Sequence, residues 1–103
     1  MAVRRGKELM LKNMLEKMWL REKDGQNTYT CLYTTLNSVA LTQFNNVNEL
    51  YKFVLNTPID MIYIKTPYGE HQIYTDKLDT YRYELSTLTI TEFSGKKHVI
   101  KLI

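Results

Sequence analysis

The stretch from Arg4 to Thr34, RRGKELMLKNMLEKMWLREKDGQNTYTCLYT, changes its hydrophobic period near its middle. In the first part, four apolar residues recur at i, i+3, i+4 and i+7, namely Leu11, Met14, Leu15 and Met18. This spacing predicts an amphipathic helix over residues 4–23, which Asp24-Gly25 would end because glycine commonly follows a helix C-terminus. Beyond it, β-branched and aromatic residues alternate with period two and predict a strand over residues 28–34.

The rest of the chain predicts one short helix and a series of strands. Asn46 and Glu49 have the spacing of a capping box and predict a helix over 47–56, because the residue before Pro58 disfavours helical geometry. Further strands are predicted over 39–44, 59–65, 70–75, 81–85, 88–93 and 98–103. We therefore expect a single α+β domain over residues 1–103, with a long N-terminal helix and one short helix packed on a mostly antiparallel sheet of about five strands.

The bulk composition is that of an ordinary globular domain. The 103 residues are 44% hydrophobic and 24% charged, which argues against disorder. Residues 1–25 carry seven basic and four acidic side chains, so the whole net charge of +3 lies on this first segment, which contains the predicted helix. The longest apolar run, Met61–Ile64, is far shorter than the roughly 20 residues that a membrane span needs. We expect a cytoplasmic protein with no membrane partner.

The side chains that carry chemistry are few and scattered. Cys31 is the single cysteine and is expected as a buried thiol in a strand, while His71 and His98 are expected as exposed residues near hairpin turns. No two of these residues have the spacing of a metal site, and the four glycines do not cluster into a phosphate-binding loop. We therefore predict no catalytic residues, no metal ligands and no cofactor, and we expect that the protein is not an enzyme.

Two features predict binding to a partner protein. Leu9 and Leu20 lie nearly opposite the apolar stripe of the first helix, which makes this helix apolar on two sides. Tyr81 and Tyr83 share one face of a predicted strand, and tyrosine is enriched in protein interfaces. We expect these four residues to contact a partner. For the tyrosines there are two alternatives: they stack nucleic-acid bases on an open sheet face, or they are simply good strand residues.

The basic residues of the first helix suggest a second kind of binding. Phosphate contacts are predicted for the cations Arg4, Arg5, Lys7, Lys12, Lys17 and Arg21. On a helical projection Lys7, Lys17 and Arg21 fall on one flank of the apolar stripe, and Arg5 and Lys12 fall on the other. The alternative is a core helix whose lysines extend along the apolar surface to reach water.

From these patterns we expect a small accessory or inhibitor protein that acts by binding a larger protein or protein–nucleic-acid complex. The abundance of Lys, Asn, Tyr, Ile and Thr suggests a protein encoded by a phage or mobile genetic element. The partner expected for such a protein is a nucleic-acid-processing or defence complex. The alternative is a protein that binds DNA or RNA directly through its basic helix. A homo-oligomer is compatible with both.

Overall fold

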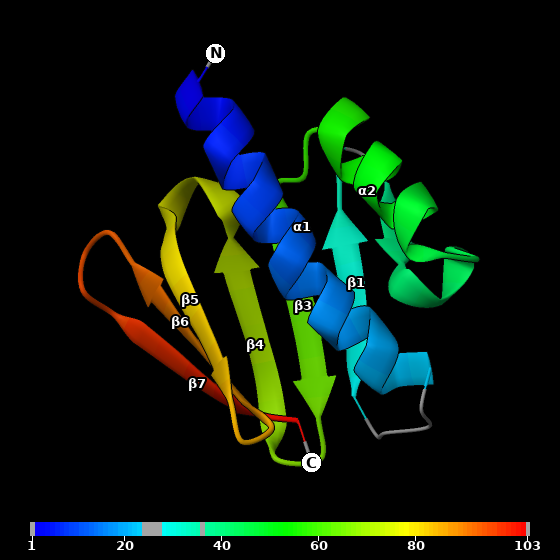
Figure 1. Ribbon diagram of the computed structural model, residues 1–103. Helices are drawn as coiled ribbons and strands as arrows, with labels where there is room; N and C mark the ends of the chain where they lie inside the picture. The colour runs from blue at the N-terminus through cyan, green and yellow to red at the C-terminus, as the bar shows by residue number, and fades with distance from the viewer. Residues whose placement is uncertain (1, 24–27, 36, 103) are drawn as a thin grey trace.

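The computed structural model describes residues 2–23, 28–35 and 37–102, with side chains from Lys7 onward in these ranges except that of residue 23 (Figure 1). Two α-helices pack against antiparallel sheets, which confirms the α+β class. The long helix is α1 (Ala2–Lys23) and the short one is α2 (Val47–Asn56). Within the described ranges, neither helix combines the length and the apolar character that crossing a membrane requires.

The strands form two sheets. Sheet A has the order β2-β1-β3-β4 and contains β1 (Tyr29–Tyr33), β2 (Ser38–Ala40), β3 (Met61–Thr66) and β4 (Gly69–Tyr74). Sheet B has the order β5-β6-β7 and contains β5 (Leu78–Glu84), β6 (Thr87–Glu92) and β7 (Lys97–Lys101). All neighbouring strands run antiparallel. The described chain therefore has seven strands, each within or near one of the predicted segments, and they form two sheets where a single sheet of about five strands was expected.

A short 3-10 helix, η2 (Thr75–Lys77), separates the two sheets. It follows β4 directly. The N–H of Phe93, in the turn that connects β6 to β7, donates a hydrogen bond to the Lys77 carbonyl at 3.0 Å. The chain therefore changes direction between β4 and β5, and β5 begins a new sheet with β6 as its partner.

The strand predicted over 39–44 is much shorter. It ends at Ala40, and the 3-10 helix η1 (Leu41–Gln43) follows. Leu41 and Phe44 are both buried. An alternating strand would place residues three apart on opposite faces, whereas a 3-10 turn places them on the same side. Burial of both residues therefore explains why the helix replaces the strand.

The core lies beneath α1, which crosses in front of sheet A in Figure 1, with sheet B to its left. The predicted apolar stripe of this helix is fully buried there, together with residues from both sheets and from α2. The Thr30 hydroxyl donates a weak hydrogen bond to the Met18 sulfur at 3.9 Å, which marks the face of sheet A that carries the helix. Trp19 Nε1 donates to the Phe44 carbonyl at 3.3 Å and joins α1 to the segment that follows η1.

The start of α2 is the predicted capping arrangement. Asn46 Oδ1 accepts a hydrogen bond from the Glu49 N–H at 3.0 Å, and Glu49 Oε2 accepts one from the Asn45 N–H at 2.8 Å. Two backbone donors that a helix start leaves unpaired are thus satisfied. The helix then buries Leu50 and Val54 beside α1.

Candidate interaction surfaces

The outer face of sheet A, opposite α1, carries most of the aromatic residues of that sheet. The cross-strand register places Tyr63 opposite Cys31, and Met61 opposite both Tyr33 and Tyr74. Paired residues point to the same side of an antiparallel sheet, so these side chains form one surface. We call it the tyrosine face, and its members are Tyr29, Cys31, Tyr33, Met61, Tyr63 and Tyr74. It points away from the viewer in Figure 1, and both helices lie on the other side.

The tyrosines pack against one another and around a buried thiol. The rings of Tyr29 and Tyr63 meet edge to face, with centroids 6.3 Å apart. Cys31 is only 3% exposed although it lies outside the main core cluster, because the surrounding side chains of the tyrosine face cover it. Tyr29 and Tyr74 remain 42% and 47% exposed. The prediction of a buried, unpaired thiol is confirmed.

Three tyrosines of this face, Tyr29, Tyr33 and Tyr63, have a raised pKa, which favours the neutral hydroxyl. Hydrogen bonding to the Cys31 side chain is the main cause that raises the pKa of Tyr29. Partial withdrawal from water, followed by the nearby Cys31, raises the pKa of Tyr33. A hydrogen bond with the Glu70 carboxylate raises the pKa of Tyr63. The face thus presents apolar rings that end in polar hydroxyl groups, which suits a protein interface that retains some water.

The charged residues beside the tyrosine face are the pair Lys65 and Glu70 and the cation Lys77, whose Nζ stands 5.5 Å from the Tyr74 ring centroid. Lys65 and Glu70 stand directly opposite each other on β3 and β4 and point to the same side as the tyrosines. Both are exposed. The lower edge of this surface therefore carries one positive and one negative charge, with no excess of cations along the strands that bear the rings.

The outer face of sheet B has a different composition. The register places Thr89 opposite Arg82 and Val99, with threonines again at Thr87 and Thr91. Arg82 forms an exposed ion pair with Glu84 at 2.9 Å. We call this surface the threonine face, and its members are Thr80, Arg82, Glu84, Thr87, Thr89, Thr91, Lys97, Val99 and Lys101.

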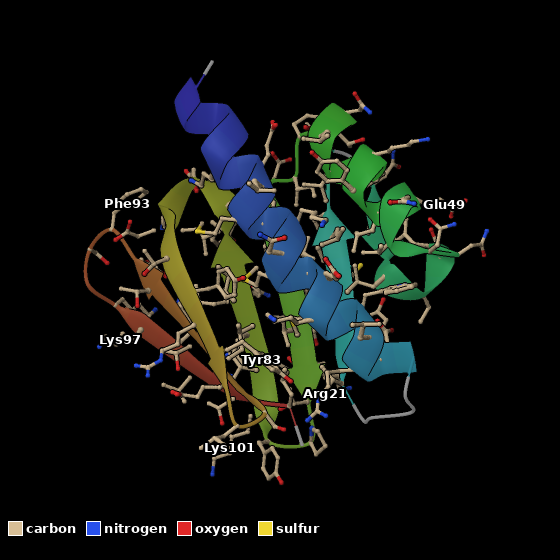
Figure 2. All side chains as sticks on the ribbon, in the orientation of Figure 1. Arg21, Glu49, Tyr83, Phe93, Lys97 and Lys101 are labelled. Carbon is tan, nitrogen blue, oxygen red and sulfur yellow. The ribbon has the colours of Figure 1, made fainter. Side chains whose placement is uncertain are left out.

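Tyr81 and Tyr83 share a face, as predicted, but it is the inner face of sheet B. They stand opposite Ile90 and Leu88, which are fully buried, and both tyrosines pack against the core. Figure 2 shows Tyr83 on the side of β5 nearest α1, where Lys17 Nζ lies 5.5 Å from the ring centroid. Both rings are therefore only partly exposed, because strand alternation alone does not tell which face is the inner one, and their contact with a partner stays a prediction.

Leu9 and Leu20 lie on the solvent side of α1, with exposed fractions of 50% and 49%. The helix is thus apolar on two sides, as its projection indicated. Asn13, which is exposed, lies on the same outer stripe, and the ion pair of Lys12 with Glu16 at 3.2 Å runs beside it. The two leucines are therefore separated by polar side chains and do not form a continuous apolar patch.

The predicted phosphate-binding cations are divided between two sides of α1. Lys7 and Lys17 lie toward sheet B, where their ammonium groups stand 5.5 Å from the ring centroids of Phe93 and Tyr83. Lys12 lies toward α2, 5.2 Å from the ring of Tyr51. The side chains of Arg4 and Arg5 lie outside the described part of the chain. The described lysines each contact a ring of the protein itself, which agrees with side chains that extend along apolar surface.

Arg21 and Glu22, near the end of α1, hold buried polar atoms without partners. Arg21 Nε and Nη2 and Glu22 Oε2 have no hydrogen bond. Neighbours in a helix sequence point about 100° apart, so these two opposite charges do not pair with each other. Burial raises the pKa of Glu22 to about 7. No sequence pattern predicts this burial, because an acidic residue next to a basic one on a helix is usually exposed.

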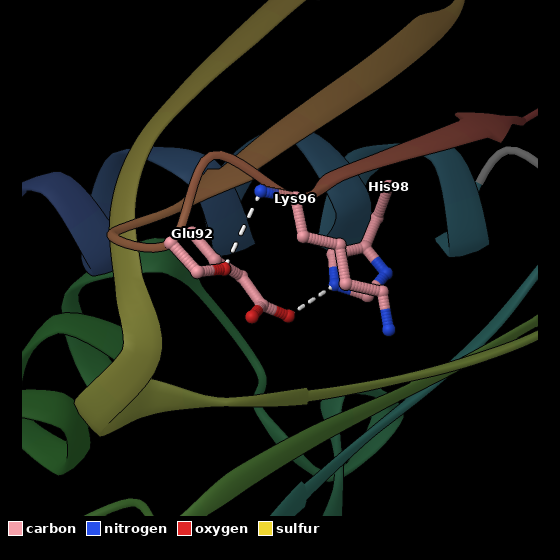
Figure 3. Close-up of polar contacts among 4 residues, drawn as sticks. Glu92, Lys96 and His98 are labelled. Carbon is pink, nitrogen blue, oxygen red and sulfur yellow. Dashed lines mark hydrogen bonds and ion pairs between the residues drawn. The ribbon is translucent and has the colours of Figure 1, made fainter.

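The two histidines come together between the sheets and are half-buried, which corrects the expectation that each is exposed. Their rings are 6.4 Å apart, and His98 Nε2 lies 2.6 Å from Glu92 Oε2 (Figure 3). The bond to His98 lowers the pKa of Glu92, while burial and then the neighbouring His98 lower the pKa of His71. No group of three or more His, Cys, Asp or Glu side chains among the described residues is arranged to hold a metal ion.

A cleft of about 200 Å³ opens between the first turns of α1, the end of α2 and the segments that lead into β3 and β5. Its apolar lining includes Leu11, Val54 and Ile59, and its polar lining includes Lys7 and Asp76. The volume is below the roughly 300–1,000 Å³ that is usual for a small-molecule site.

No family model, curated protein or solved structure matches this chain. The candidate surfaces therefore rest on geometry and chemistry alone. The tyrosine face was missed at first because its members are spread over three strands. A sequence feature that could have predicted it is the composition of β1 and β3. Most of their residues are apolar or aromatic on both sides of the strand, which indicates a strand with two apolar faces.

Proposed function

We propose that this protein is a small binding module that acts by covering a surface of a larger protein, and that the tyrosine face is its contact surface. The observation that supports this most strongly is the uncovered layer of tyrosines on sheet A, with Tyr29 and Tyr74 close to half exposed. Tyrosine and methionine are enriched in interface cores, and well-packed aromatic residues contribute most of the binding energy.

The rigidity of this surface also favours binding. The rings stand on paired strands and touch one another, so they lose little freedom when a partner covers them. The polar tips of Tyr33 and Tyr63 allow the partner to supply hydrogen bonds, whereas an entirely apolar face would favour self-association.

The charge of the tyrosine face favours a protein over a nucleic acid. Binding of single strands by base stacking is usually accompanied by a positively charged groove along the backbone. Here Lys65 is balanced by Glu70 across the strand pair. A partner of mixed polar and aromatic surface, such as a subunit of a nucleic-acid-processing or defence complex, is the occupant that this balance suits, and the protein would act on it as an accessory factor or inhibitor.

The test is quantitative capture from lysate of the cells that carry the gene, with two matched double variants. Tyr29→Ser with Tyr74→Ser removes the exposed rings of the tyrosine face, and Arg82→Ser with Thr89→Ser alters the threonine face. We expect the first variant to lose about 100-fold in affinity for the captured partner and the second to lose less than about threefold. Circular dichroism would establish that both variants fold.

Equal capture by the two variants would contradict the proposal. The alternative, direct DNA or RNA binding, is tested on the same samples by fluorescence anisotropy between about 50 and 300 mM salt. Binding that falls steeply with salt and is lost on charge reversal of Lys7 and Lys17 would favour the basic helix instead.

A further inference from the structure

The turn between β5 and β6 holds two residues in an unusual backbone conformation. Leu85 and Ser86 have φ of 52° and 60°. A two-residue hairpin with positive φ at both positions is a type I′ turn, for which Asn-Gly is the preferred sequence because other side chains crowd the backbone. Leucine is therefore an unfavourable residue at position 85, because its side chain strains a backbone with positive φ.

The side chain of Leu85 gains nothing within the protein that would offset this strain. It is 92% exposed, the largest exposed fraction of any large apolar residue described. The turn itself is firmly held. The Leu102 N–H donates to the Ser86 carbonyl at 3.0 Å, and the Thr87 hydroxyl donates to the Leu85 carbonyl at 3.4 Å. Leu85 is thus an exposed apolar side chain on a turn whose backbone is held by hydrogen bonds.

A second exposed ring lies at the same end of the molecule. Tyr68, in the β3–β4 turn, is 66% exposed, and Lys101 Nζ lies 5.9 Å from its ring centroid. The end of β7 contacts both turns: Lys101 lies over the Tyr68 ring, and the next residue, Leu102, donates its N–H to Ser86 in the β5–β6 turn. Both turns lie at the lower end in Figure 1, and Figure 2 marks Lys101 there.

We propose that Leu85 is an anchor that inserts into an apolar pocket on a protein partner. An exposed leucine that strains its own turn has a physical benefit only where it becomes buried, and the rigid turn reduces the entropy that burial would cost. This contact lies at the tip of sheet B and does not depend on the tyrosine face of sheet A.

The charges at this end favour a protein pocket over a lipid surface. Loops that bind membranes combine apolar residues with cations that attract anionic lipids. Here Arg82 is paired with Glu84 at 2.9 Å, and Lys101 is the cation that stands over the Tyr68 ring. One inserted leucine with so small a surplus of charge is too little to hold a protein on a bilayer, since even a single acyl chain binds only marginally.

Two substitutions separate the anchor from the turn. Leu85→Asn places a residue preferred by a type I′ turn and removes the apolar side chain. Ser86→Gly relieves the same turn and keeps Leu85. We expect Ser86→Gly to raise the melting temperature by about 4–8 °C and Leu85→Asn to raise it by about 3 °C.

Binding is measured with a photo-crosslinking amino acid at position 85, in lysate of the cells that carry the gene. A discrete crosslinked product should be competed away by unlabelled wild-type protein and by the Ser86→Gly variant. The Leu85→Asn variant should compete at least about tenfold less well although it is more stable than the wild type. A destabilised fold cannot produce that combination.

Equal competition by Leu85→Asn, or the lack of any discrete product, would overturn the proposal. Sedimentation with vesicles of phosphatidylcholine and phosphatidylserine is the second arm, and Leu85-dependent binding there would overturn it in favour of a lipid surface. The Tyr29→Ser, Tyr74→Ser variant, labelled at position 85, reports separately on the tyrosine face: it should still crosslink even if that face proves to have no partner.

Discussion

The two outer faces of this protein are built on the same kind of antiparallel sheet but carry different side chains. The threonine face of sheet B carries β-branched and charged residues, such as Thr89 and Arg82, and the β-branched ones favour strand geometry. The tyrosine face of sheet A uses large rings, such as Tyr29 and Tyr74, which remain close to half exposed. Since threonine meets the needs of a strand as well as tyrosine does, strand formation alone does not explain the rings. The difference indicates that sheet A is shaped by something other than its own stability.

The largest expected effect compares adjacent residues on β3. Ile64 is fully buried on the inner side and Tyr63 lies on the tyrosine face. We expect Ile64→Ala to lower the free energy of unfolding by about 3 kcal/mol through a cavity in the core. Tyr63→Ala should lower it by about 1 kcal/mol or less. Urea denaturation measures both. Equal losses would mean that the tyrosine face is a second core, and the comparison of the two outer faces would fail.

The next effect concerns the cover over Cys31. Because this thiol is 3% exposed beneath the tyrosine face, it should react slowly with a thiol reagent. Tyr33→Ala opens the cover and should raise the labelling rate by about tenfold or more, since the thiol no longer depends on local opening to reach solvent. Thr89→Ala, on the other sheet, serves as the control and should leave the rate unchanged. An unchanged rate in the Tyr33 variant would show that other atoms bury the thiol.

A smaller effect is expected at Glu22, whose charge influences Tyr29 at the border of the tyrosine face. Its pKa of about 7 lies above the ordinary 4.5, so the folded protein binds a proton that the unfolded chain has already released. Glu22 therefore lowers stability progressively as the pH rises from 4.5 to about 7. Glu22→Gln should raise the free energy of unfolding by about 1 kcal/mol above this range, a value discounted for the remaining exposure to water.

The pH dependence supplies the internal control for Glu22. The advantage of the glutamine variant should shrink as the pH is lowered and vanish below 4.5, where both states of the wild type are protonated. A constant difference at every pH would assign the gain to packing instead of charge.

The smallest effect belongs to the histidine pair where the two sheets meet. Burial lowers the pKa of His71 below 6.5, so the unfolded chain takes up a proton before the folded one does as the pH falls. Stability should decline from about pH 6.5 downward, and the lowered pKa of Glu92 adds a later loss at more acidic pH. His71→Gln should flatten the first part of the curve by less than about 1 kcal/mol. Glu92→Gln should remove the later loss at more acidic pH. Urea midpoints measured from neutral to acidic pH would show both; identical profiles for wild type and His71→Gln would contradict the assignment.

The sequence predicted the local elements well where a strong signal was present. The stripe of Leu11, Met14, Leu15 and Met18 is buried as expected, and Asn46 caps α2 through its side chain. These features depend on residues close together in the chain, so periodicity and spacing are sufficient to find them. The α+β class follows from them directly.

The arrangement of the strands depended on contacts that no local pattern contains. Whether Tyr81 or Arg82 points inward depends on which side of sheet B meets α1, and alternation is the same in both cases. The tyrosine face needs Tyr29, Tyr63 and Tyr74 to come together from three strands, which only the register shows. Likewise, the positive φ of Leu85 could not be predicted, because the Leu-Ser pair is not a usual type I′ sequence.

The shortness of β2 has a consequence for the behaviour of the protein in solution. This strand forms one edge of sheet A, spans only Ser38–Ala40, and gives way at once to η1. A long free edge would offer a row of unpaired backbone groups on which a further chain could grow as fibrils do, whereas three residues offer almost none. We therefore expect this edge of sheet A not to grow by addition of another chain, even though the sheet displays several aromatic rings to water.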